Sequence, residues 1–259
     1  TRSAGDVIGL LIKALVGVAV LTFSGPITLS ADSMISSSAN PFTLDAAATI
    51  NQGGNALTFY GNLGVTPLVV NGVITGSGQI NKTGANTMTL SSNNAATVTG
   101  SAVVSAGTLL VTNAGALGNT AAGTTVASGA TLSLQNGLTL AEPLTVNGGT
   151  LANNGVGTAT FSGGIALSGA CVFNTAPSGG NISVTTQPLT GAGSIAKTSL
   201  GDLILGVDSP AFTGTVSAQS GVLRVDTAAA LGAASPGTSV DGGTLQINVT
   251  GASEEVTMS

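Results

Sequence analysis

The chain has 259 residues and very little charge. Five Lys and Arg and ten Asp and Glu make up 6% of positions, where soluble domains average about a quarter. Histidine is absent and there is one cysteine, which excludes histidine acid–base chemistry, multi-cysteine zinc sites and an intrachain disulfide framework. The net charge of −5 provides no basic surface for nucleic acid. We expect a folded protein that is not an enzyme, holds no cofactor or metal, and does not bind nucleic acid.

The chain begins with an apolar arm. Val7 to Phe23 reads VIGLLIKALVGVAVLTF, interrupted by one charge, Lys13. As a helix it would extend about 26 Å, at the short end for a membrane span. Three interpretations stay open: a cap on the rest of the chain, a joint between subunits, and a membrane or export element. The candidate assembly residues are Val7, Leu10, Leu11, Leu15, Val18, Leu21 and Phe23. We place the arm at residues 1–35 and one repeat domain at 36–259.

A long internal repeat follows. Residues 76–118 and 191–232 align with one residue of difference in length. Self-similarity at a fixed period is typical of repeat architectures. The aligned landmarks are Gly76 with Gly191, Ile80 with Ile195, Lys82-Thr83 with Lys197-Thr198, Leu90 with Leu205, Gly100 with Gly214, Leu109 with Leu223, and Leu117-Gly118 with Leu231-Gly232.

A shorter period lies inside the repeat. A glycine separated from a leucine by one or two residues recurs, with the leucine at Leu109, Leu132, Leu151, Leu223 and Leu245. Short alternating stretches lie between, bounded by Gly, Asn, Ser and Pro, and predict short strands joined by turns. A coil-sized period, many small residues and few charges favour a solenoid over a sandwich or barrel. We predict an all-β fold, a right-handed parallel β-helix of roughly ten coils and about 50 Å in length.

These residues also carry a family resemblance. The run GSGQINKTG at 76–84, continued by Met88-Thr-Leu90, Thr99-Gly100 and the stretch from Ala106 to Gly118, resembles the autotransporter-associated β-strand repeat. Residues 191–232 form a second copy. The resemblance covers roughly residues 72–250 and implies a β-helical passenger of a bacterial surface protein. It implies nothing about a ligand.

The best candidates for glycosidase chemistry are two acids. Asp202 and Asp226 lie 24 residues apart, about one coil, so they could stack on one face with Asp208 and Arg224 nearby. Glycosidic cleavage needs two carboxyl groups roughly 5 to 9.5 Å apart. The simpler interpretation is that they are charges on the solvent face, and Asp45 and Asp241 are expected to be turn residues. Calcium is not expected, because no Asp-rich glycine nonapeptide occurs.

Other polar positions have simple structural interpretations. Cys171 is expected in the core beside Val172 or Phe173, with an intermolecular bridge as the alternative. Lys82 and Lys197 are expected at solvated corners of the coils, with ligand contact as the alternative. Asparagines are expected at turns, some aligned into amide ladders between coils.

The sequence favours durability over reactivity. A rod of Thr, Ser, Val and Ala with few titratable groups should respond weakly to pH and salt, and it offers few sites for trypsin. The leading hypothesis is an extracellular or cell-surface structural protein of bacteria, a β-solenoid unit of a fibre, sheath or adhesive stalk that self-associates head to tail. The alternatives are an adhesin passenger that binds a host molecule or glycan, with Phe59, Tyr60 and Phe212 as the available aromatics, and a carbohydrate-active enzyme.

Overall fold

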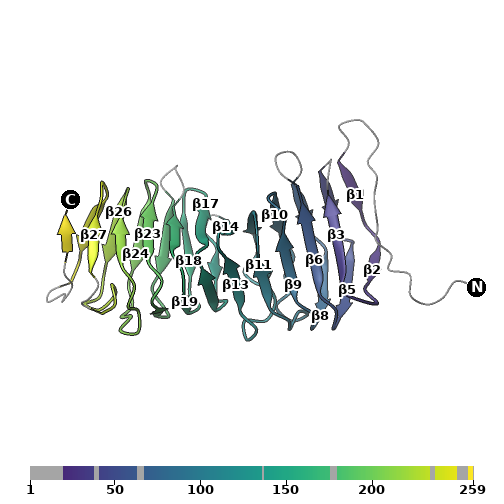
Figure 1. The fold of residues 1–259 in the computed structure, drawn as a ribbon. Helices are drawn as coiled ribbons and strands as arrows, with labels where there is room; N and C mark the ends of the chain where they lie inside the picture. The colour runs from purple at the N-terminus through teal and green to yellow at the C-terminus, as the bar shows by residue number, and fades with distance from the viewer. Residues whose placement is uncertain are drawn as a thin grey trace, which may run out of the picture.

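The computed structural model describes residues 20–37, 41–62, 67–135, 137–175, 180–233, 237–249 and 256–258. Within them the chain is all β-strand and turn, without a helix. It winds into a right-handed solenoid of about ten turns, which confirms the predicted fold. Figure 1 shows the rungs stacked in chain order from β1 to β27.

Three sides make up each coil, and every strand pairing between neighbouring coils is parallel. The long sheet contains twelve strands. They are β1 (Leu21–Phe23), β4 (Phe42–Leu44), β7 (Leu68–Val70), β10 (Thr87–Leu90), β12 (Thr108–Val111), β14 (Thr131–Gln135), β17 (Thr150–Asn154), β20 (Cys171–Asn174), β23 (Ile195–Thr198), β25 (Val216–Ala218), β27 (Thr238–Val240) and β29 (Val256–Met258).

The second side is a sheet of eight strands. They are β3 (Ser33–Ser37), β6 (Leu57–Gly61), β9 (Ile80–Thr83), β11 (Ala102–Val104), β13 (Thr124–Ala127), β16 (Leu144–Asn147), β19 (Ile165–Leu167) and β22 (Leu189–Gly191). Each of its strands is followed in the chain by a strand of the long sheet.

Two separate sheets share the third side, because the strands of both follow strands of the long sheet in the chain. β24, β26 and β28 are then followed directly by strands of the long sheet, since the eight-strand sheet ends at β22. The three-strand sheet holds β2 (Pro26–Thr28), β5 (Thr49–Gly53) and β8 (Val73–Gly76). The six-strand sheet holds β15 (Thr139–Leu140), β18 (Thr158–Phe161), β21 (Asn181–Val184), β24 (Asp202–Leu205), β26 (Val222–Val225) and β28 (Thr244–Ile247). In the two coils between them, residues 91–101 and 112–123 cross this side mainly as turns.

Alternation of side chains fills one continuous core. In β6, for example, Leu57 and Phe59 are fully buried while Thr58 and Tyr60 are partly exposed. Inward residues stack in register from coil to coil, as Leu109 on Leu132 and Leu132 on Leu151. The coils therefore share one apolar core, and neither end of the stack has a separate core.

The solenoid already includes part of the predicted arm. β1 pairs in parallel with β4, and Leu21 and Phe23 pack half-buried on the core. β2 and β3 complete this first described coil, so strand pairing begins at Leu21, before residue 36. The other assembly candidates, Val7, Leu10, Leu11, Leu15 and Val18, lie outside the described residues.

The two copies of the long repeat have one structure but different places around the solenoid axis. In the first copy β9 lies in the eight-strand sheet and β10 in the long sheet. In the second copy the equivalent β23 lies in the long sheet and β24 in the six-strand sheet. The second copy is therefore displaced by one side of the coil, and the equivalence of the two copies is a property of the local strands and turns rather than of a particular face.

Candidate functional site

The most specialised polar group in the interior is the ammonium of Lys82. Its side chain points inward from β9, two residues after the inward Ile80, and is 1% exposed. Nζ donates to the carbonyl oxygens of Thr83 at 2.9 Å, Gly84 at 2.7 Å and Ala106 at 3.0 Å. Two of these carbonyls belong to the corner that follows β9 and the third to the corner of the next coil. Lys82 thus ties two successive coils together from inside.

Lys197 repeats this arrangement on another side of the solenoid. It is fully buried, and Nζ donates to Thr198 O at 2.9 Å, Ser199 O at 2.8 Å and Ser220 O at 2.8 Å. The expectation that both lysines lie at solvated corners is wrong. Alternation along the strand aims them inward, where the aliphatic stem packs in the core and the three N–H groups match three corner carbonyls. We call each such arrangement a lysine clamp.

Burial sets the protonation of both clamps. Desolvation lowers the pKa of Lys82 to about 8, and it lowers the pKa of Lys197 to about 8 against the opposing effect of the Asp202 charge. Both groups are thus largely cationic at neutral pH and enclosed by carbonyl oxygens, with no reacting partner at Nζ. This chemistry is structural: it satisfies buried carbonyls that the turns leave without a strand partner.

The clamp requires a left-handed backbone two residues after the lysine. Gly84 occupies this position in the first copy with φ of 74°, and Ser199 occupies it in the second with φ of 68°. Ser199 is the only non-glycine residue in the described part of the chain with positive φ. Its hydroxyl donates to Asn174 Oδ1 at 2.6 Å, which holds a conformation that serine otherwise disfavours.

Both copies also contain the same pair of stacked turns. In the first copy the amide of Ile74 donates to Asn94 Oδ1, and Val98 forms a bridge with Gly76. In the second copy the amide of Leu189 donates to Ser209 Oγ, and Phe212 forms a bridge with Gly191. Phe212 is buried, as is Phe59, so of the three aromatics considered for a binding groove only Tyr60 is partly exposed.

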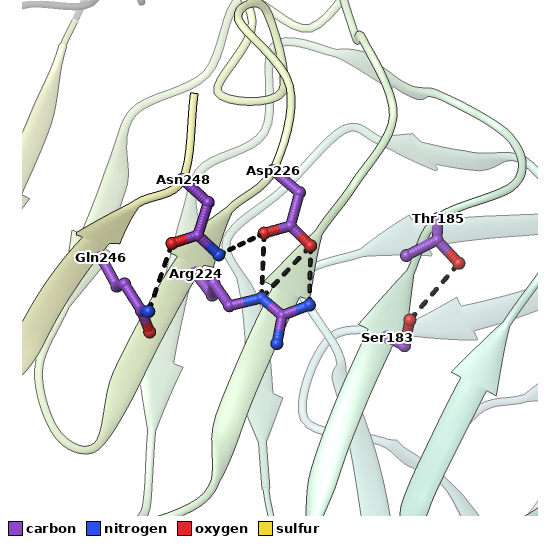
Figure 2. A network of polar contacts seen from close by, with 6 residues as sticks. All are labelled: Ser183, Thr185, Arg224, Asp226, Gln246 and Asn248. Atoms are coloured by element: carbon purple, nitrogen blue, oxygen red, sulfur yellow. Dashed lines mark hydrogen bonds and ion pairs between the residues drawn. The ribbon is translucent and has the colours of Figure 1, made fainter. Parts of the chain in front are cut away.

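The two acids considered for glycosidase chemistry do not stack. Register places Val222 beside Asp202, while Asp226 follows the end of β26. The Arg224 guanidinium donates to Asp226 in a bidentate pair with a shortest distance of 2.7 Å, and Asn248 Nδ2 donates to the same carboxylate at 2.8 Å (Figure 2). The hydrogen bond from Arg224 is the main reason that the pKa of Asp226 is lowered. This carboxylate is thus held ionised in a surface network.

The remaining acids considered in the sequence make local hydrogen bonds. Asp208 accepts from the amide of Ala229 in the next coil, and Asp45 accepts from the amides of Ala47 and Ala48, as expected for a turn residue. Asp241 accepts from the hydroxyls of Ser217 and Ser239. In the described residues no group of three or more His, Cys, Asp or Glu side chains could hold a metal ion.

Glu142 is the buried acid that the sequence analysis did not single out. It is 3% exposed and occupies an inward position between Leu140 and Leu144 in the alternating run LTLAEPLTV. Thr124 Oγ1 donates to Glu142 Oε1 at 3.3 Å. Burial raises the pKa of Glu142 to about 7, against the opposing effect of the Thr124 hydroxyl. The alternation alone would have placed this side chain in the core.

Cys171 lies fully buried in the core, as predicted, and Phe173 rather than Val172 is the residue that points inward with it. Burial raises the pKa of the thiol to about 12. Several asparagines join coils through the backbone instead of through amide ladders. Asn94 Nδ2 donates to Ala116 O, and Asn153 Nδ2 donates to Asn181 O.

The part of the chain that the structure describes contains no helix of the length and apolarity that a membrane crossing requires. Comparison with family models, curated proteins and solved structures found no match for this chain.

Proposed function

We propose that this chain is a bacterial extracellular or cell-surface structural protein, a β-solenoid unit of a fibre, sheath or adhesive stalk, similar to autotransporter passengers. The observation that carries the proposal is the pair of lysine clamps. In each clamp the hydrogen bonds of a buried ammonium join two coils. This use of a buried charge is expected of a protein whose role depends on a rigid rod.

The distribution of charge supports the same role. Between Lys82 and Lys197 only Glu142 carries a charge in the sequence, and its side chain is buried. The middle coils thus present a neutral surface of Thr, Ser, Asn, Ala and Val. The stability of a rod with such a surface should depend little on salt and on moderate changes of pH, which suits a protein exposed to a variable medium.

We further propose that the units self-associate, with the apolar arm as the joint. β1, β2 and β3 each have a strand partner on one side only within the described residues. The inward residues Leu21 and Phe23 are half-buried there, and Val20 and Met34 are 61% and 54% exposed. A strand edge next to exposed apolar side chains favours pairing with another chain. Membrane contact by the arm is the competing outcome.

Electron microscopy and sedimentation of the purified chain test this proposal. Filaments with an axial repeat close to the length of one rod support it, and Leu11→Asp with Leu15→Asp should abolish them. Thr89→Asp, an outward residue of β10, is the matched control and should leave them intact. A monodisperse single rod at all concentrations would reject self-association, and binding of the wild-type chain to lipid vesicles that the arm variant loses would assign the arm to the membrane.

A further inference from the structure

The side chain of Glu142 lies where two architectures of the third side meet. It connects β15, the first strand of the six-strand sheet, to β16. The preceding coil crosses the third side without a strand, and it ends in the exposed turn at residues 119–123, which we call the covering loop. Among the strands that the structure describes, β15 pairs only with β18, and its other edge faces the coil of the covering loop.

Thr124 connects the covering loop to the coil of Glu142. Its amide donates to Pro143 O at 2.9 Å, and its hydroxyl donates to Glu142 Oε1 at 3.3 Å. Within the described residues, the other hydrogen bonds of the loop are internal or reach coils nearer the N-terminus, such as that of the Asn119 amide to Val98 O. Thr124 is also the first residue of β13 that pairs with β16, so the loop itself is tied to the next coil only where it meets Thr124.

Small residues surround the Glu142 backbone. A Cβ on Gly163, in the following coil, would come within 2.2 Å of Glu142 O, so the chain packs tightly on that side. No element that packs here contributes a charge: β13, β15, β16, the covering loop and residues 162–164 contain no Lys, Arg or Asp and no Glu other than Glu142. An ionised carboxylate at this position has no cation to pair with and little access to water.

We propose that Glu142 is a proton-controlled latch. The neutral carboxyl group stays in the core and holds Thr124, so that the covering loop closes the corner beside β15. On ionisation the carboxylate moves toward water, its contact with Thr124 is lost, and the loop opens at the unpaired edge of β15. The switch is local, since the lysine clamps on both sides do not depend on Glu142, and it is a property beyond the structural role proposed above.

Hydrogen exchange measured by mass spectrometry, corrected for the intrinsic effect of pH on amide exchange, tests the latch. Amides of residues 119–123 and 139–143 should lose protection as the pH rises from about 4.5, the ordinary pKa of a glutamate, to about 7, by up to about tenfold for each pH unit, and the loss should level off above about pH 7. Amides of β24 and β26 are the internal reference and should not change. Glu142→Gln should keep the loop protected at about pH 5 and about pH 8.5 alike.

Thr124→Val separates a latch from a passive contact. Because the hydrogen bond from the Thr124 hydroxyl to Glu142 is made only while the loop is closed, its removal should weaken the closed state and move the midpoint of the transition to lower pH, which a purely structural role would not do. Equal protection of the wild type at both pH values, or the same pH dependence in Glu142→Gln, overturns the proposal. If Glu142→Gln does not fold, infrared titration of the wild-type carboxyl decides, because a group already ionised at about pH 6 also overturns it.

Discussion

Replacing Lys82 by methionine should destabilise the solenoid, although methionine has nearly the same shape. The substitution leaves Thr83 O, Gly84 O and Ala106 O without their shared donor. At about 1 kcal/mol for each buried carbonyl the loss is about 3 kcal/mol. The substitution also removes the free-energy cost of burying the ammonium charge, which offsets part of this loss. The expected net loss of stability is therefore about 2 kcal/mol.

Chemical denaturation followed by circular dichroism measures this loss. Lys197→Met should behave like Lys82→Met, since the two clamps share their geometry. Asn81→Ala, at the partly exposed neighbouring position on β9, is the matched control and should change stability by less than about 0.5 kcal/mol. If Lys82→Met is as stable as the wild type, the ammonium does not hold the corner and the reasoning on clamps is wrong.

Four further outcomes follow from particular contacts. Ser199→Gly should stabilise the protein by up to about 1 kcal/mol, because glycine adopts positive φ without strain, and Ser217→Gly on β25 should destabilise it; the same sign for both would contradict this explanation. Gly100→Ala should cost about 3 kcal/mol of stability, since the new Cβ would lie 1.9 Å from Gly78 O. Gly129→Ala, with open space around it, should cost only the strain of its positive φ. Equal losses of stability in the two variants would show that the corners are not closely stacked. The folded protein should gain stability between about pH 8 and pH 10.5 relative to a Lys82→Met, Lys197→Met double variant, because the folded lysines release their protons at lower pH than the unfolded chain; a parallel pH profile for both proteins would refute it. Cys171 should resist thiol reagents until the chain unfolds, and rapid labelling of the native protein would place it outside the core.

The sequence predicts the architecture well because each coil of the solenoid repeats the same pattern of corner and inward residues. The recurring glycine–leucine step marks corners and inward positions, and the aligned copies 76–118 and 191–232 fold alike. What it does not reveal is the side on which each copy lies, because nothing local distinguishes one side of the coil from another.

The interior polar groups were predictable in principle. Lys82 follows Ile80 by two residues, and Glu142 alternates with Leu140 and Leu144, so the same period that identifies the core places both inside it. The general rule that charged residues are exposed led to the wrong place for the lysines. One carbonyl partner of each lysine comes from the corner of the next coil, 24 residues away for Lys82 and 23 for Lys197, and only the folded register brings it to the ammonium.

Distances along the outward row of the long sheet test the central claim most directly. Thr87, Thr108, Thr131, Thr150, Val172, Ala196 and Ser217 are successive partners in register. Spin labels at Thr87→Cys and Thr150→Cys, with Cys171→Ser as background, should lie about 14 Å apart, and labels at Thr87→Cys and Ser217→Cys about 29 Å apart, because each coil adds about 4.8 Å. Distances that fail to grow with the number of coils would contradict the stacked solenoid.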